Sequence, residues 1–499
     1  MNLDPRTPVV VGVGQRLQRP DELTRSVEPY RLMTEAVEAA LADTGTSGLA
    51  DWIEWIGVVQ GAWSYTDPGR LIADDLGFNR ARTALTTEGG QAPQAAVNTL
   101  CQRIADGELD CAVLTGGETI WSRRRLRRSG LRLPTTQQDD ARPDEVLGRG
   151  LAMSSPFEIE RGVDQPIVVY PILESAIRSA RGETLDQHRD RISRLWEGFN
   201  RVATRNQYAW RRDRLTADQI REPSAGNRMV GFPYTKAMNS NWDLDLASAT
   251  IICSAQAAKA AGVTTDRWVF PWAGGQANDT TFVSNRRDLH SSPAIAAIGK
   301  AVLSHCGLTA DDIEHVDLYS CFPSAVQIAA AALGLSLERQ LTVTGGLTFA
   351  GGPLNNYVGH SIATMVEVIR HNGGAGLVTA NGGYATKHSL GIYHHEPPSR
   401  PFRDFDQQAE ADLVPRVEAD PAFIGSALIE AYTVMHDAEG PTHGVAALRT
   451  HTGARTWARL DDEDDIGTLL VEEGIGRTAG VDKAGHARLL DAAGNDRPV

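Results

Sequence analysis

The stretch GGQAPQAAVNTLCQRIADGELDCAVLTGGE, residues 89–118, joins a glycine-rich turn, a helical pattern and a short apolar strand. Residues 351–383, GGPLNNYVGHSIATMVEVIRHNGGAGLVTANGG, repeat that order. Short apolar strands that alternate with helices are typical of layered α/β folds with buried sheets. Two copies of one unit predict pseudo-twofold symmetry, with a cleft where the copies meet.

The segments that precede the two stretches also resemble each other. EAVEAALADTG (35–45) has the apolar spacing of a helix and ends at a glycine, as does AIGKAVLSHCG (297–307). A short apolar strand pattern follows each of them, in DWIEWIGVVQG (51–61) and in DDIEHVDLYS (311–320). The repeat distance is roughly 260 residues, so we expect each copy to be half of one large domain.

The halves are interrupted and then followed by segments of different composition. We expect the first half to comprise residues 1–120 and 241–266, and the second half 267–397. The arginine-rich, helical segment 121–240 is interpreted as an inserted loop or cap over the cleft. After a proline-rich boundary, short strand patterns predict a separate small β-barrel domain in 405–499.

Composition excludes several classes of function. The formal net charge of -14 argues against a general nucleic-acid binder, which is normally basic. The five cysteines form no C-x-x-C pair, so we expect no metal site, and reduced thiols in a cytoplasmic protein. No run of 18 apolar residues occurs and the N-terminal stretch lacks a signal-peptide pattern, so no transmembrane segment is expected.

Four stretches, in their order and spacing, resemble the thiolase superfamily, particularly the thiolases of the sterol-carrier-protein type and thiolase-like proteins. They are ELDCAVLTGGE (108–118), DLDLASATIICSAQAAKAAGV (243–263), DLYSCFPSAVQ (317–327) and GGLTFAGGPLNN (345–356). The resemblance implies a five-layer α/β/α/β/α fold of two pseudo-symmetric halves, and by analogy a homodimer. The tail is similar to OB-like modules that accompany thiolase-related acyl-CoA proteins.

The resemblance also implies acyl transfer from coenzyme A thioesters, as in acetyl-CoA acetyltransferases of lipid metabolism. Thiolases use a cysteine nucleophile at a helix N-terminus, a histidine that activates it and a second cysteine that moves a proton. Here Gly89 takes the place of the nucleophile and Gly352 that of the histidine, while Thr379 or Ala380 replaces the second cysteine. Classical thiolysis or Claisen condensation is therefore improbable.

Two side chains are candidates for a catalytic role in place of these groups. Cys321 is either a relocated nucleophile or a small buried residue. His360 is either a displaced base or a structural histidine on a helix face.

Other residues are candidates for binding. Backbone N–H groups of the turns at Gly89 and Gly352 can hold a thioester carbonyl or a phosphate. The polar side chains expected to position a ligand are Tyr319, Ser320, Asn355, Asn356 and Asn381. The arginines of SRRRLRRSGLRL (122–133) either bind the phosphates of coenzyme A, through Arg123, Arg124 and Arg125, or form solvated surface.

Two hypotheses of function remain open, so whether the chain is an enzyme stays undecided. In the first, it is an acyl-CoA-binding, acyltransferase-like protein with a degenerate thiolase site. In the second, it is a non-catalytic carrier of acyl-CoA or lipid, or a partner subunit. Both have a coenzyme A thioester as a non-covalent substrate or ligand, and neither requires a covalently bound cofactor.

Overall fold

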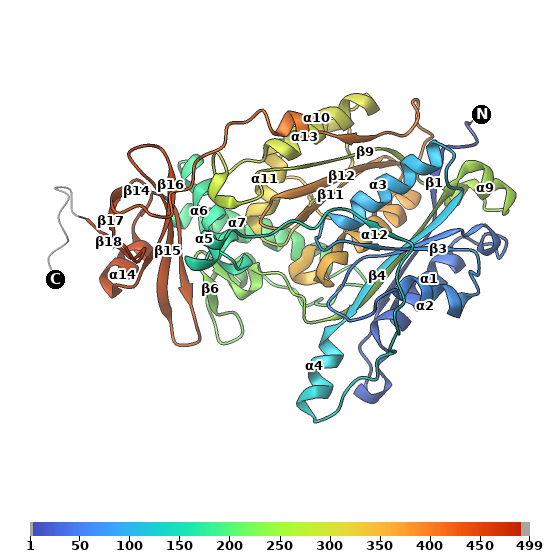
Figure 1. Cartoon of the computed structure of the whole chain (residues 1–499), viewed down its shortest axis with the longest axis horizontal. Coiled ribbons are helices and arrows are strands. Elements are labelled where there is room, and N and C mark those ends of the chain that lie inside the picture. Colours follow the sequence, from blue (N-terminus) through green and yellow to red (C-terminus); the bar gives the residue numbers. More distant parts are fainter. Residues whose placement is uncertain (1–2, 491–499) are drawn as a thin grey trace.

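Three β-sheets organise the residues that the computed structural model describes, 3–490 (Figure 1). The first sheet has the spatial strand order β1 (Pro8–Leu17), β8 (Asp245–Ser254), β4 (Cys111–Thr119), β2 (Trp55–Val58), β3 (Arg82–Thr86) and β5 (Glu145–Leu147). Strands β4 and β8 are buried along their whole length, which explains their continuous apolar character.

The second sheet belongs to the second repeat. Its strand order is β10 (His315–Asp317), β11 (Ala375–Gly382), β12 (Lys387–His394), β9 (Phe270–Asn278) and β13 (Asp404–Asp406). β13 pairs with β9 in parallel, so the chain leaves this sheet only at the point where the C-terminal domain was predicted to begin.

Helices complete five layers, and the predicted fold is confirmed. Between the sheets lie α3 (Ala92–Ala105) and α12 (Tyr357–Asn372), each in contact with strands of both sheets. The outer face of the first sheet carries α1 (Pro29–Asp43) and α2 (Pro68–Leu76). The second sheet is covered by α10 (Pro293–Cys306), which packs against α11 (Pro323–Leu333).

The two repeated helices end as their glycines predict. Thr44 follows α1 and Gly45 then adopts φ +71°. Gly307 ends α10 with φ +69°, and its N–H donates to a carbonyl of the last turn. A glycine adopts this left-handed conformation without the steric cost of a Cβ, so the chain reverses at the same place in both repeats.

The C-terminal domain is a third, all-β unit. Its strand order is β16 (Arg455–Leu460), β15 (Pro441–Arg449), β14 (Gly425–His436), β17 (Thr478–Val481) and β18 (Ala487–Leu489). A bridge between Arg459 and His486 brings the two ends of this order together, so the sheet curls into the expected barrel-like shape. Helix α14 (Glu463–Val471) packs against β14 and β15, and residues 491–499 of the predicted domain lie outside the described residues.

The segment 121–240 joins the three units rather than forming a layer of its own. Its helices are α4 (Ile120–Arg128, which begins one residue earlier), α5 (Pro156–Glu160), α6 (Pro166–Ala180), α7 (Leu185–Ala203) and α8 (Ala217–Arg221). Its strand β5 covers the edge of β3, and β6 (Met229–Gly231) pairs with β7 (Tyr234–Thr235) and β14. Helix α6 contacts both α11 and β14, while α4 projects away from the body (Figure 1).

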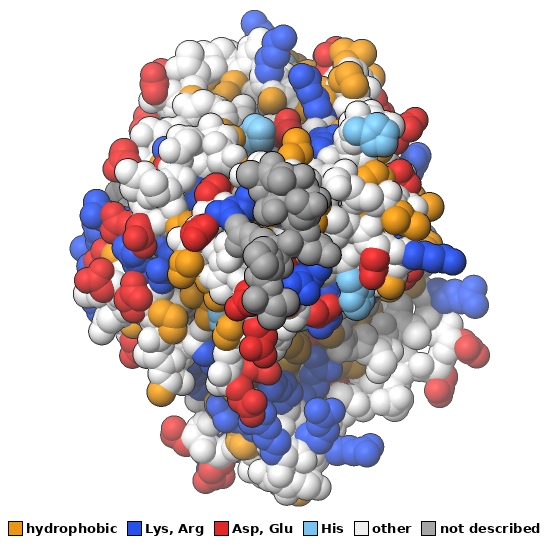
Figure 2. All heavy atoms as spheres, turned by 90° about the vertical axis from the view of Figure 1, so that its left-hand side faces the viewer, with side chains coloured by type: hydrophobic (Ala, Val, Ile, Leu, Met, Phe, Trp, Pro, Cys, Tyr) orange, Lys and Arg blue, Asp and Glu red, His pale blue; other side chains and the backbone are white. Residues whose placement is uncertain are grey.

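On the visible face of the C-terminal domain, neither acidic nor basic side chains predominate. Figure 2 shows acidic and basic side chains interspersed around the grey atoms on this side of the molecule.

Candidate functional site

The N-terminus of α3 meets the loop after β10 and the end of β11. Gly90, two residues before the helix begins, lies against the Tyr319 hydroxyl and the backbone of Asn381. The short β10 ends in this loop, and β10 pairs in parallel with β11, which delivers Asn381 to the same end of the sheet. The fold therefore brings together Gly89, Tyr319, Cys321 and Asn381, which the sequence had placed at one site.

The space that a side chain would need at this turn is filled. An ideal Cβ on Gly90 would lie 2.3 Å from Tyr319 Oη and 2.4 Å from the carbonyl oxygen of Asn381. On Gly89, where φ is +146°, it would lie 2.0 Å from Gln91 Oε1. Real Cβ atoms do not approach other atoms this closely, so neither glycine position accommodates a cysteine without rearrangement.

The turn keeps its backbone donors. Within residues 3–490, no hydrogen bond is formed by the N–H groups of Gly89, Gly90 and Gln91. Tyr319, Thr379 and Asn381 also line a cavity of about 20 Å³, whose walls do not include the three residues of the turn. That volume holds about one water molecule, not an acyl chain.

The position of the expected histidine is filled by a leucine of the same repeat. An ideal Cβ on Gly352 would lie 2.8 Å from Leu347 Cδ2. The N–H of Gly352 donates to the carbonyl of Asn241 at 2.9 Å, so it is not free for a ligand. The expectation of available donors at the second glycine turn is wrong for this N–H, because Asn241 of the first half supplies its acceptor.

The thiol of Cys321 lies in a cluster that excludes water. Its Sγ accepts from Asn381 Nδ2 at 3.9 Å, and the neighbouring Phe322 stacks on Tyr170 of α6 with ring centroids 4.6 Å apart. Burial raises the pKa of Cys321 to about 12. Because the thiolate is the nucleophile, this geometry favours the interpretation of Cys321 as a buried small residue.

His360 points toward the first repeat and bonds to a side chain of β1. Its Nδ1 lies 2.8 Å from Gln15 Oε1, and its Nε2 is buried with no partner among the described residues. Burial lowers the pKa of His360 to about 3. A neutral imidazole held by Gln15 fits the structural alternative better than a base at the cleft.

This buried histidine predicts a loss of stability in acid. An unfolded histidine has a pKa near 6.5, so between that pH and about 3 the unfolded chain binds a proton that the folded chain does not. The free energy of unfolding should fall as the pH decreases from about 6.5, by ~2 kcal/mol at pH 5. Urea denaturation of His360→Gln should show a shallower decline than wild type, whereas exposed His451→Gln should not. Equal pH profiles for all three proteins would contradict the prediction.

The amides predicted to position a ligand bind the protein itself. Asn355 Nδ2 donates to the carbonyl of Gln60 at 2.8 Å, and Asn356 Nδ2 donates to the carbonyl of Gly116 at 2.7 Å. Ser320 Oγ accepts from the N–H of Leu347 at 3.3 Å. The two amide contacts connect the two repeats, whereas the Ser320 contact lies within the second repeat. Asn381 differs, because its buried Oδ1 has no partner in the described chain.

The arginines of α4 also have partners within the chain. Arg123 bonds to Glu118, with Nη2 and Oε2 3.0 Å apart, and Arg124 bonds to Asp243 at the same distance. Arg125 lies over the ring of Trp121, 4.4 Å from its centroid. The structure does not bring α4 to the turn at Gly90, so a role in phosphate binding stays a prediction.

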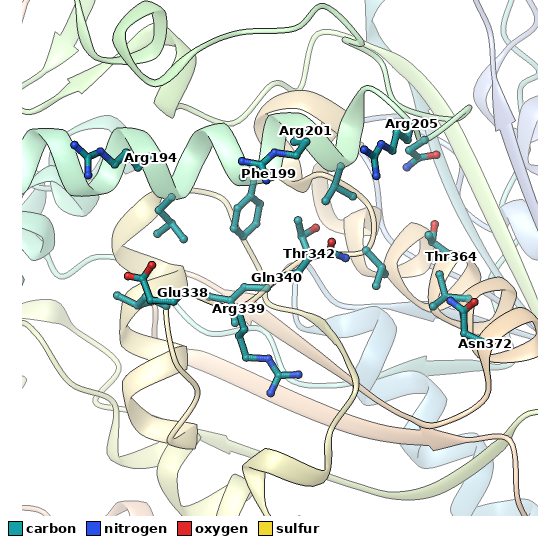
Figure 3. Close-up of a pocket in the computed structure, with 18 of the residues that line it drawn as sticks. Arg194, Phe199, Arg201, Arg205, Glu338, Arg339, Gln340, Thr342, Thr364 and Asn372 are labelled. Carbon is teal, nitrogen blue, oxygen red and sulfur yellow. The ribbon is translucent and has the colours of Figure 1, made fainter.

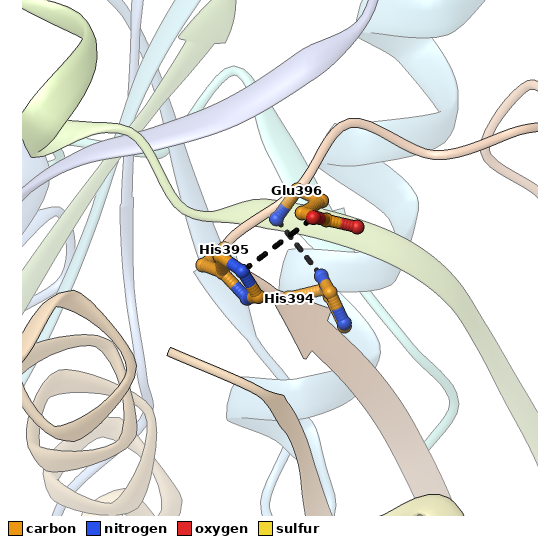
Figure 4. A group of neighbouring side chains, drawn as sticks. All are labelled: His394, His395 and Glu396. Carbon is orange, nitrogen blue, oxygen red and sulfur yellow. Dashed lines mark hydrogen bonds and ion pairs between the residues drawn. The ribbon is translucent and has the colours of Figure 1, made fainter. Parts of the chain in front are cut away.

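One surface cluster, His394, His395 and Glu396, has ligand atoms close enough for a metal ion (Figure 4). His394 Nδ1 accepts from the N–H of Glu396, and His395 Nδ1 accepts from the N–H of Gly374, both at 2.8 Å. A neutral imidazole whose Nδ1 accepts carries its proton on Nε2, so neither ring offers a free lone pair. The donor set does not fit a metal as arranged.

Two features of the site were not predicted from the sequence. Tyr170 reaches it from α6, where its hydroxyl accepts from Asn381 Nδ2 at 3.0 Å and donates to the carbonyl of Gly383. Gln91 fills the space at Gly89. Neither residue belongs to a sequence motif. The one signal in the sequence is the presence of aromatic and polar residues near the expected cleft.

Comparisons with known proteins agree with the fold. Residues 406–486 match the family model described as the thiolase-like protein type 1 additional C-terminal domain. The chain is similar to the crystal structure of a monomeric SCP2-thiolase like protein type 1 from Mycobacterium smegmatis. The two share 30% identity over 98% of this chain and 100% of that chain, with a TM-score of 0.85. No curated protein matches the sequence.

Two further structures share the fold alone. An Ltp2–ChsH2(DUF35) aldolase has 17% identity and a TM-score of 0.60, over 79% of this chain and 99% of that chain. The acetyl-CoA acetyltransferase from Syntrophomonas wolfei has 16% identity and a TM-score of 0.55, over 78% and 99%. Among residues 3–490, no helix has the length and apolar character needed to span a bilayer.

Proposed function

Because the chain belongs to the SCP2-thiolase-like proteins of type 1, we propose that it binds acyl-CoA-class thioesters without transferring the acyl group. The single observation that carries the proposal is the turn before α3, where Gly89, in the place of the thiolase nucleophile, has no side chain and φ +146°, and where Tyr319 Oη and the carbonyl of Asn381 fill the space of a Cβ at the adjacent Gly90. A covalent acyl intermediate needs a nucleophile at this turn.

The remaining groups of the site support binding rather than chemistry. Cys321 is protonated at neutral pH, since burial raises its pKa to about 12. His360 is neutral but bonded to Gln15, and its unpaired Nε2 is enclosed. Neither side chain has both the protonation state and the access that acyl transfer requires.

The ligand class comes from the resemblance to thiolases, whose substrates are coenzyme A thioesters. The M. smegmatis relative is described as monomeric, and here β5 covers the edge of β3. The homodimer expected by analogy, and the cytoplasmic location, stay predictions.

The proposal is tested by following binding and transfer in one sample. Adding a long-chain acyl-CoA should raise the melting temperature, because a ligand that binds only the folded state stabilises it. The intact mass of the protein should not change, and free coenzyme A should not accumulate. The absence of any thermal shift would remove the binding claim, and an acylated protein would favour the acyltransferase alternative.

A further inference from the structure

A wide groove lies outside the site described above. It has a volume of about 1280 Å³ and runs between α7, the loop 337–343 and the C-terminal half of α12 (Figure 3). Its volume exceeds the 300–1,000 Å³ typical of pockets for small ligands, so it suits a long molecule.

One wall of the groove is cationic. Arg194 and Arg201 line it from α7, and positions that are 7 residues apart lie on one face of a helix. Arg205 lines the same wall from the turn that follows the helix. Arg194 pairs with Asp190 at 2.9 Å, whereas Arg201 and Arg205 are exposed and form no ion pair within residues 3–490.

Few acidic groups oppose the two unpaired arginines. The other carboxylates that line the groove are Glu338, on the loop, and Glu367, on α12. In a chain with a net charge of -14, an open wall with two unpaired guanidinium groups is a local site for an anion.

The floor of the groove is apolar. Half-buried side chains line it beside the arginines, namely Leu195, Val202, Leu337 and Val368. Phe199 extends from α7 into the same space (Figure 3). A cationic wall along an apolar floor is complementary to an amphiphile with an anionic head and an apolar chain.

We propose that this groove binds the phosphates and the chain of an acyl-CoA-class ligand, with the phosphates at Arg201 and Arg205 and the acyl chain on the apolar floor. The inference rests on the proposed function and names its site. Guanidinium forks match phosphate oxygens in pairs. The groove supplies the volume that the cavity of about 20 Å³ beside Tyr319 lacks.

Charge reversal on the wall tests the site. Arg201→Glu/Arg205→Glu should weaken binding of dodecanoyl-CoA by roughly 10- to 100-fold, since hydrogen bonds between charged groups are lost and repulsion is added. The matched control is Arg127→Glu/Arg128→Glu, which reverses two exposed arginines of α4 that also form no ion pair within residues 3–490. The control should bind as wild type does, by isothermal titration calorimetry.

A second variant blocks the groove without changing its charge. Gly198 lies in α7 between the arginines and lines the groove, and an ideal Cβ there meets no atom within 4 Å. Gly198→Leu should therefore fold normally and still lose binding. Pyrophosphate and dodecanoic acid, titrated separately, should each bind more weakly than the whole thioester, because each uses one part of the groove.

The outcomes separate the site from the function. Wild-type affinity in both groove variants would overturn the groove and leave the proposed function standing. A wild-type protein that binds no coenzyme A compound would overturn the function itself. Arginine-dependent binding of an acidic peptide, without binding of dodecanoyl-CoA, would assign the groove to a protein partner and contradict the proposal.

Discussion

Gly90→Ala is expected to lower the free energy of unfolding by about 3 kcal/mol. The new Cβ would meet Tyr319 Oη at 2.3 Å and the carbonyl oxygen of Asn381 at 2.4 Å. The tyrosine can move, but the carbonyl belongs to β11, so the sheet or α3 must shift. The measurement is urea denaturation at neutral pH, and Gly90→Cys should be similarly destabilised.

The matched control is expected to change the free energy of unfolding in the opposite direction. Gly198→Ala, on α7, places its Cβ in open space and should raise stability by about 1 kcal/mol, because alanine has the higher helix propensity. If Gly90→Ala were as stable as wild type, the space beside the nucleophile position at Gly89 would be open, and the argument from filled space would fail.

Arg455→Ala is expected to cost about 3–5 kcal/mol and to loosen the C-terminal domain from the second repeat. Arg455 is fully buried and bonds to both carboxylate oxygens of Glu430 at 2.8 Å. Its Nη1 also donates to the carbonyls of Ser284 and Arg286, at 2.9 and 2.6 Å. The substitution leaves a mostly buried carboxylate and these carbonyls without this partner.

The control for this prediction lies on the same strand. Arg459 of β16 pairs with Asp461 at the surface, where the two side chains are 47% and 40% exposed. Exposed pairs contribute at most about 1 kcal/mol, so Arg459→Ala should change stability little. Similar losses in both variants, measured by urea denaturation, would show that the buried arginine does not hold the domain.

The repeat was sufficient to predict a layered α/β core of two related halves, and the resemblance to thiolases implied its five layers. Helix and strand periodicity recurs at roughly 260 residues, and Gly45 and Gly307 end equivalent helices at equivalent conformations. Such patterns are local, so one sequence contains them. The C-terminal β domain was equally predictable from its short strand patterns and the turns between them.

The contents of the site were less predictable, because they depend on packing between distant segments. The sequence shows Gly352 in the place of the thiolase histidine, but it does not show that Leu347 occupies the space of that side chain. Tyr170 is separated from Asn381 by about 210 residues, and no local pattern indicates their contact. The arginine run of α4 is conspicuous in the sequence because its residues are consecutive. The absence of ion-pair partners for Arg201 and Arg205 within residues 3–490, which makes them candidates for anion binding, can be seen only in the structure.

The most direct test of the account is the intact mass of the protein after prolonged incubation with acetyl-CoA at neutral pH, with binding confirmed in the same sample by its melting temperature. The account predicts a raised melting temperature and an unmodified mass, because the space at Gly90 is filled and the pKa of Cys321 is about 12. A mass increase of one acetyl group, mapped to Cys321 and abolished in Cys321→Ser, would contradict it.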